Sequence, residues 1–180
     1  GKHIPFASVS DKAAECSITF GAPSKTFNIA GIVTSYAIVP NETLRNKFFG
    51  WMGGNELNQP DIFAPIATIA AFENGEEWRQ QMLRYVEENI EFTIAFCKEN
   101  IPQIKAVRPE ASFLVWLDCR GLNMPHTEIV KLFTEKANLA LNDGAMFGTQ
   151  GEGFMRLNVG TTRATLEKAL KQLQFAIENI

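Results

Sequence analysis

The sequence has few of the residues on which several kinds of functional site depend. It contains only two histidines and three cysteines among 180 residues, and no two cysteines form a Cys-x-x-Cys pair. Zinc sites in proteins are built from closely spaced histidine and cysteine ligands, so the sequence argues against such a site. It also lacks a Gly-x-Ser-x-Gly segment, which argues against the nucleophile motif of the α/β-hydrolases.

Basic charge and long apolar runs are scarce as well. The net charge is −3 and the pI is near 5.5, which argues against nucleic acid as a partner. The longest apolar stretches, such as residues 62–72, are too short to cross a bilayer, so we expect no membrane partner. The odd, scattered cysteines Cys16, Cys97 and Cys119 fit a reducing compartment, and we expect a cytoplasmic protein.

Hydrophobic residues make up 46% of the chain, which predicts a packed core, and the pattern divides it into three regions. Residues 1–75 contain two predicted strands, 16–20 and 34–40, that we expect to pair antiparallel. Two helices follow, one capped by Asn41 and one over 60–75 that is apolar enough to be buried on most sides. Residues 76–100 form one long helix that we expect to bridge two domains.

The third region, residues 101–180, is predicted to be a compact α+β unit. Strands are expected at 111–119, 139–143 and 154–160, and a helix at 126–137. Asp118 and Asp143 are interpreted as turn and strand-end residues. Thr162 is expected to cap the last helix, whose apolar stripe consists of Leu166, Ala169, Leu170, Leu173 and Ile177.

Lys25 is the only charged residue between Ser17 and Asn41. The ordinary interpretation is a solvated loop lysine, because lysine is seldom buried. The alternative is chemical, since a desolvated amine has a lowered pKa and becomes the nucleophile that a Schiff base requires. Ser24 supplies a hydroxyl beside the amine, and Pro23 stiffens the turn.

Arg156 is similarly unusual within its strand. Alternation places Met155, Leu157 and Val159 on one face, and Phe154, Arg156 and Asn158 on the other. This pattern fits an edge strand with a solvated outer face. It fits equally a guanidinium that binds a carboxylate through two parallel hydrogen bonds.

Several motifs together resemble one enzyme family. "APSKTFNIAG", residues 22–31, resembles the lysine motif of fold-type I pyridoxal-phosphate enzymes, and "RLNVGTTRATLEKAL", residues 156–170, resembles their carboxylate-arginine segment. "GEEWRQQMLRYVEEN", "ASFLVWLDCRGL" and "LNDGAMFG" resemble the cystathionine β-lyase-like branch of the class I/II aminotransferases. The resemblance implies an α/β fold comprising the end of the large-domain sheet, a long bridging helix and a small α+β domain.

The resemblance also implies a mechanism. Lys25 would form the internal aldimine with pyridoxal 5'-phosphate and then act as general base at the substrate Cα. Ser24 would help to hold the cofactor phosphate, and Arg156 would bind the substrate carboxylate. In the lyase branch, the substrate then loses a thiolate from Cβ, and the products are a thiol, pyruvate and ammonia.

The sequence departs from the family pattern in two ways. Val33 stands where typical aminotransferases carry a phosphate-binding arginine, and Ala22 stands where many carry a serine, which favours a β-lyase over an aminotransferase. The glycine-rich turn, ring-stacking aromatic and pyridinium-pairing aspartate of the family cannot be placed. We therefore expect a C-terminal fragment: residues 1–75 from the large domain, the bridging helix 76–100, and the small domain 101–180, inactive by itself.

Two further expectations concern assembly and function class. Relatives are dimers, and "GGNELNQPD" resembles the loop that reaches toward the neighbouring cofactor, with Asn58 and Gln59 as the reaching residues; an ordinary helix connection fits equally. We expect a homodimer that acts on a small amino-acid substrate. An aminotransferase is one alternative, and a non-catalytic α+β assembly module is another.

Overall fold

The computed structural model describes residues 3–180 and contains two compact units, Gly1–Gln81 and Met82–Ile180. We call them unit 1 and unit 2. The helix α5, Glu76–Asn100, begins in unit 1 and continues into unit 2, and the domain boundaries expected from the sequence stay a prediction. No helix among residues 3–180 combines the length and the apolar character that a membrane span needs.

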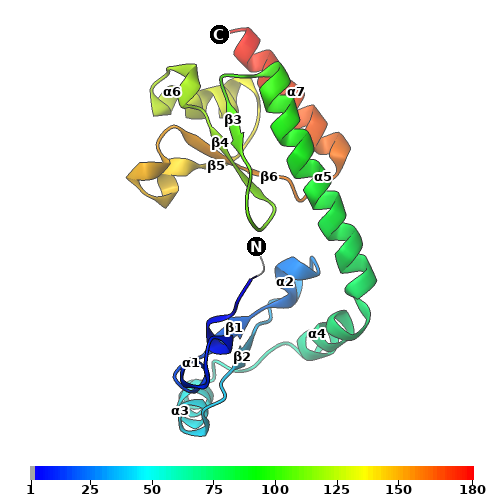
Figure 1. Ribbon diagram of the computed structural model, residues 1–180, viewed down its shortest axis with the longest axis vertical. Helices are drawn as coiled ribbons and strands as arrows, with labels where there is room; N and C mark the ends of the chain where they lie inside the picture. Colours follow the sequence, from blue (N-terminus) through cyan, green and yellow to red (C-terminus); the bar gives the residue numbers. More distant parts are fainter. Residues whose placement is uncertain (1–2) are drawn as a thin grey trace. The chain divides into compact units, whose positions relative to one another are not determined.

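Unit 1 is built around one small two-stranded sheet (Figure 1). Strands β1, Thr19–Gly21, and β2, Tyr36–Ile38, pair antiparallel, as predicted. Its helices are α1, Asp11–Glu15, α2, Pro23–Thr26, α3, Glu42–Gly54, and α4, Phe63–Asn74. The side chain of Asn41 caps α3 by accepting a hydrogen bond from the Leu44 N–H group, as predicted.

The apolar side chains of unit 1 are mostly exposed. Ala64 is the only buried residue of α4, so the expectation that this helix is buried on most sides is wrong for the described chain. Large exposed side chains on and beside α3 and α4 include Phe49, Trp51, Ile62, Phe63, Ile66, Ile69 and Phe72. A helix that is apolar all round needs neighbours on several faces, and residues 3–180 do not supply them.

Unit 2 contains a four-stranded antiparallel sheet in the order β3-β4-β6-β5 (Figure 1). The strands are β3, Lys105–Val107, β4, Leu114–Asp118, β5, Asn142–Asp143, and β6, Phe154–Asn158. The helix α6, His126–Lys131, continues as a π-helical turn, Leu132–Lys136, and α7 spans Arg163–Glu178. The capping of α7 by Thr162 is confirmed, whereas β3 is a strand that the sequence pattern did not reveal.

The helices of unit 2 pack on one face of this sheet. Met155, Leu157 and Val159 are buried in a core that also contains Val115 and Leu117 of the neighbouring strand. Helix α7 contributes Leu166, Leu170 and Leu173, and α5 contributes Ile90 and Cys97. The predicted alternation along residues 154–160 is therefore confirmed, and Arg156 lies on the opposite, open face of the sheet.

Candidate functional site

Lys25 lies on α2, a single helical turn of unit 1. Beside it, the Phe27 ring packs edge-on against Phe72 of α4 with centroids 5.3 Å apart, which anchors the turn. The Ile29 N–H group donates to the Ser24 carbonyl oxygen at 3.0 Å, and this hydrogen bond closes the turn that carries Lys25. The backbone that carries the lysine is thus held in place by its neighbours.

The side chain of Lys25 is exposed, and its amine makes no hydrogen bond or ion pair within residues 3–180. Within residues 3–180 this exposure agrees with the ordinary interpretation of a solvated lysine and not with the desolvated alternative, and the role of Lys25 toward a cofactor stays a prediction. The turn sits at the surface of unit 1, where few side chains surround it. Ser24 is half-buried, and its hydroxyl is likewise without a partner in the described part of the chain.

The loop that follows α2 holds an unfavourable backbone conformation. Val33 has φ 49° and ψ 58°, in the left-handed region, and is 83% exposed. A β-branched residue is rarely found there, and such positions typically cost about 1–3 kcal/mol and cluster at functional sites. The correspondence between Val33 and the phosphate-binding arginine of the family, which the resemblance implies, stays a prediction.

Asn58 and Gln59 are exposed and line a groove of about 600 Å³ in unit 1. The groove runs between β2, α3 and α4, and Phe48, Met52 and Ile69 form part of its apolar wall. Lys25 does not line it. The role of the two amides toward a neighbouring subunit stays a prediction.

Arg156 lies in the interior of the unit 2 sheet, not on an edge strand. It pairs with Trp116 of β4 on one side and with Asn142 of β5 on the other. Its Nη2 atom donates to Asn142 Oδ1 at 2.9 Å, and its Cζ atom lies 4.4 Å from the centroid of the Phe147 ring. The guanidinium is thereby held by one hydrogen bond and one aromatic face.

The Nε atom of Arg156 is buried and has no hydrogen-bond partner among residues 3–180. Leaving a buried donor unpaired costs about 1–3 kcal/mol, and more when the group is charged. A carboxylate is the group that a guanidinium pairs with best, through two parallel N–H···O bonds. Because Nε itself is buried, a carboxylate would have to reach the guanidinium through its terminal nitrogens, of which Nη2 donates to Asn142 and Nη1 makes no hydrogen bond among residues 3–180.

Sequence reasoning missed a contact between His126 and Asp143. His126 Nε2 lies 2.7 Å from Asp143 Oδ1, and the Gly153 N–H group donates to His126 Nδ1 at 3.0 Å. Asp143 was predicted only as a strand-end residue. Seventeen residues separate the pair, and no sequence motif marks it, so only the tertiary fold reveals it.

The remaining reactive groups do not form a second site. Burial raises the pKa of the Cys97 and Cys119 thiols to about 12, which makes both poor nucleophiles at neutral pH. Residues 3–180 contain no group of three or more acidic, histidine or cysteine side chains able to hold a metal ion.

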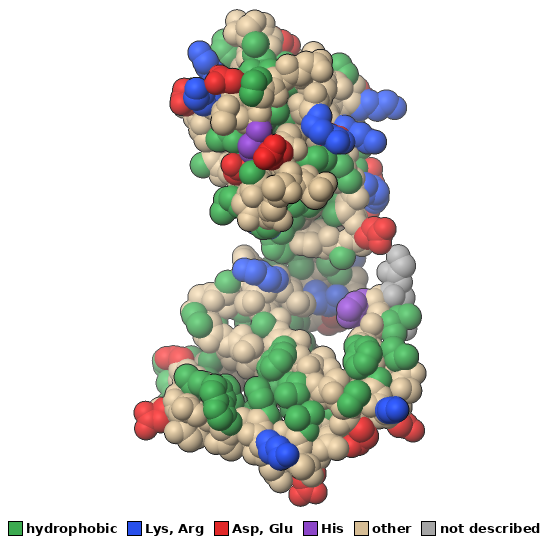
Figure 2. Space-filling model, turned by 90° about the vertical axis from the view of Figure 1, so that its left-hand side faces the viewer, with side chains coloured by type: hydrophobic (Ala, Val, Ile, Leu, Met, Phe, Trp, Pro, Cys, Tyr) green, Lys and Arg blue, Asp and Glu red, His purple; other side chains and the backbone are tan. Residues whose placement is uncertain are grey.

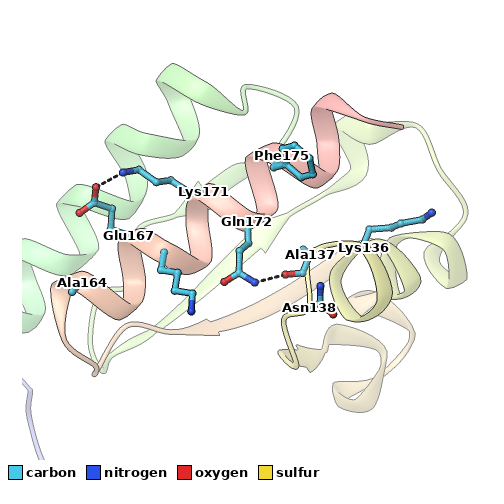
Figure 3. A pocket seen from close by; sticks show the side chains of 9 residues that line it. Lys136, Ala137, Asn138, Ala164, Glu167, Lys171, Gln172 and Phe175 are labelled. Carbon is cyan, nitrogen blue, oxygen red and sulfur yellow. Dashed lines mark hydrogen bonds and ion pairs between the residues drawn. The ribbon is translucent and has the colours of Figure 1, made fainter.

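A second groove, of about 590 Å³, lies in unit 2 along α7 (Figure 3). In it, Lys171 pairs with Glu167 at 2.6 Å, and Gln172 Nε2 donates to the Ala137 carbonyl oxygen at 2.9 Å. Some of the polar groups that line this groove are therefore already paired with each other. None of the predicted site residues lines it.

The predicted residues fall in different units. Lys25, Ser24, Asn58 and Gln59 belong to unit 1, and Arg156 belongs to unit 2. The mechanism that the resemblance implies requires Lys25 and Arg156 to face one cleft, and this placement stays a prediction.

The chain is similar to known proteins along nearly all of its length. It is 39% identical over 176 residues to the cystathionine β-lyase PatB of Bacillus subtilis, an alignment covering 98% of this chain and 46% of PatB. A pyridoxal-phosphate-bound structure from Clostridium difficile 630 is 38% identical, with a TM-score of 0.93, over 98% of this chain and 46% of its own. The aspartate aminotransferase of Pyrococcus horikoshii is 27% identical over 98% of this chain and 44% of its length. The chain spans about half the length of these relatives, and no family profile matches it.

Proposed function

We propose that the chain belongs to the fold-type I pyridoxal-phosphate enzymes, in the branch that contains the cystathionine β-lyases, and that the whole protein is a C–S β-lyase acting through Lys25. The observation that carries the proposal is the amine of Lys25, which lies unpaired within residues 3–180 on an anchored turn. The chain that contains it is 39% identical to a cystathionine β-lyase, in an alignment that covers 98% of this chain. We propose further that the chain is the C-terminal part of that enzyme.

The residues near Lys25 fit pyridoxal 5'-phosphate. A primary amine is the group that holds an aldehyde cofactor, and the Lys25 amine has no partner within residues 3–180. The neighbouring Ser24 hydroxyl is available to donate to a phosphate oxygen. When bound, the cofactor supplies the electron sink that allows a proton to leave the Cα of an amino acid.

Two residues of the chain would then have separate roles in the reaction. Lys25 holds the cofactor and takes the proton from the substrate Cα, as a general base. Arg156 binds the substrate carboxylate through its terminal nitrogens, and so fixes the orientation of the Cα–H bond. Phe147 covers one face of the guanidinium and Asn142 holds Nη2, which limits the directions in which Arg156 can donate.

The assembly belongs to the same proposal. We expect a cytoplasmic homodimer in which Asn58 and Gln59 reach toward the partner's cofactor. The exposure of both amides beside the groove of unit 1 is compatible with that role.

An aminotransferase is the second candidate, favoured by the similarity to the Pyrococcus horikoshii enzyme. The exposed Val33 in place of a phosphate-binding arginine favours the lyase. The two reactions differ in their requirements, because an aminotransferase needs a 2-oxo acid to accept the amino group and a lyase does not.

The test uses the full-length protein loaded with the cofactor and given cystathionine alone. A lyase releases a thiol and pyruvate without any added 2-oxo acid. Borohydride reduction should fix the cofactor on Lys25, located by peptide mass mapping. Lys25→Ala should abolish this labelling and lower turnover by about 10²–10⁴-fold.

Arg156→Ala should raise KM by about 10- to 100-fold, as expected for the loss of hydrogen bonds between charged groups. Product release that depends strictly on a 2-oxo acid would establish the aminotransferase instead. Labelling on a lysine other than Lys25 would refute the assignment, and no labelling at all would favour the assembly module.

A further inference from the structure

The imidazole of His126 connects two segments that flank Arg156. Its Nδ1 atom accepts a hydrogen bond from the Gly153 N–H group, so the ring proton resides on Nε2 in the neutral ring. Nε2 donates this proton to Asp143 Oδ1 at 2.7 Å, and the histidine side chain is only 17% exposed. His126 thus joins the start of α6 to the end of β5 and to the start of β6.

The segment that His126 holds is short and carries both partners of Arg156. Strand β5 consists of Asn142 and Asp143 alone, so its ladder with β6 is too short to fix its position firmly. Asn142 is the residue that accepts from Arg156 Nη2. Asp143 also accepts from the Ala145 N–H group at 2.8 Å and thereby starts the 3-10 helix Gly144–Phe147, which places the Phe147 ring over the guanidinium.

A close glycine contact supports the same segment from its far end. A Cβ atom on Gly151 would lie 1.9 Å from the Gly144 carbonyl oxygen, so the two backbones touch directly. The segment 143–151 is therefore held at its start by the hydrogen bonds of Asp143 to His126 and Ala145, and at its end by the contact of Gly151 with Gly144. Phe147 lies between these two points.

We propose that His126 is a positioning residue for Arg156, which it does not contact itself. Through Asp143 it fixes Asn142 and Phe147, and these set the orientation in which the guanidinium presents its terminal nitrogens. The inference rests on the proposed function, in which Arg156 binds the substrate carboxylate. Without the His126–Asp143 bond, the guanidinium would sample other orientations and bind a carboxylate more weakly.

Two substitutions of His126 form a matched pair. In His126→Gln, the amide nitrogen reaches the position of Nε2 and keeps a donor toward Asp143. In His126→Asn, the amide reaches only the position of Nδ1, so the acceptor for Gly153 is retained and the donor toward Asp143 is lost. The pair separates the bond to Asp143 from the bond to Gly153.

The experiment measures steady-state kinetics of the full-length holoenzyme with cystathionine, together with urea unfolding midpoints. His126→Asn should raise KM about 5-fold, the effect of one hydrogen bond, and leave kcat within about 2-fold. His126→Gln should keep KM close to the wild-type value. Combined with Arg156→Ala, His126→Asn should have no further effect on KM, because the group through which it acts is gone.

Three outcomes would overturn the inference. In the first, His126→Asn lowers the unfolding midpoint and leaves KM unchanged, so the histidine serves only stability. In the second, its effect on KM is the same with and without Arg156→Ala, so it acts elsewhere. In the third, Arg156→Ala alone leaves KM unchanged, which removes the carboxylate role of Arg156; only this outcome also contradicts the proposed function.

Discussion

Asn89 is a polar residue at the centre of the unit 2 core. It is fully buried, and its Nδ2 atom donates to the carbonyl oxygens of Val159 and Thr161, each at 2.9 Å. Its Oδ1 atom accepts from Arg163 Nε at 2.8 Å. One amide side chain thus ties α5 to the segment between β6 and α7.

We predict that Asn89→Ala lowers the free energy of unfolding of unit 2 by about 2–4 kcal/mol, because it leaves two backbone carbonyls without their donor. Urea unfolding followed by circular dichroism measures the change. Asn100→Ala is the matched control, since Asn100 is an exposed asparagine on the same helix, and should change the free energy by less than about 0.5 kcal/mol. Equal effects of the two substitutions would contradict the prediction.

At the scale of a single element, the start of α5 is stabilised by Glu76. Its carboxylate accepts from Arg79 Nε and Nη2, both at 2.7 Å, and from Gln80 Nε2 at 2.8 Å. The hydrogen bonds from Arg79, and then from Gln80, lower the pKa of Glu76 to about 2. The position in the first turn also suits a negative charge.

This lowered pKa predicts a pH dependence of stability. The folded-state pKa is below the unfolded value of 4.5, so the contribution of Glu76 is complete above pH 4.5 and is lost as the pH falls toward 2. Glu76→Gln should therefore be less stable than the wild type at pH 7, and the difference should close between pH 4.5 and pH 2. Urea midpoints across this range measure it.

Glu88→Gln is the control for Glu76. Glu88 is exposed on the same helix, and its carboxylate makes no hydrogen bond or ion pair within residues 3–180. It should show no such pH-dependent difference. A gap between wild type and Glu76→Gln that persists unchanged at pH 2 would show that the carboxylate acts through something other than its ionisation.

At the scale of the whole molecule, the main feature is the exposed apolar surface of unit 1. Figure 2 shows hydrophobic side chains gathered over this part of the chain, and Ile66 and Ile69 are 64% and 55% exposed. Exposed apolar patches of this kind mark surfaces that become covered by another chain or another segment. The patch lies on α3 and α4, beside the groove of Asn58 and Gln59.

We predict that the 180-residue chain self-associates through this patch. Light scattering across a dilution series should show a dimer or larger species, and Ile66→Lys with Ile69→Lys should shift it toward monomer. Phe175→Lys is the control, because Phe175 is 67% exposed on α7 of unit 2 and lies outside the patch. A monomer at all concentrations would mean that the patch drives no association.

Much of this molecule could be predicted from the sequence, because the signals are local. The strands of unit 1, the cap of α3 by Asn41, the extent of α5 and the stripe of α7 follow from spacing and capping alone. The alternation that buries Met155 and Leu157 and leaves Arg156 on the open face follows from the pleat. Lys25 and Arg156 could be singled out because each is a cation among apolar neighbours.

The tertiary structure decided what local patterns cannot express. It placed Arg156 in an interior strand with an unpaired Nε, and it brought His126 to Asp143 across seventeen residues. It also left Lys25 and α4 exposed, although an apolar sequence predicts burial, because burial depends on which neighbours are present. Residue spacing determines which face a side chain occupies, whereas the partners of that side chain come from segments that only folding brings together.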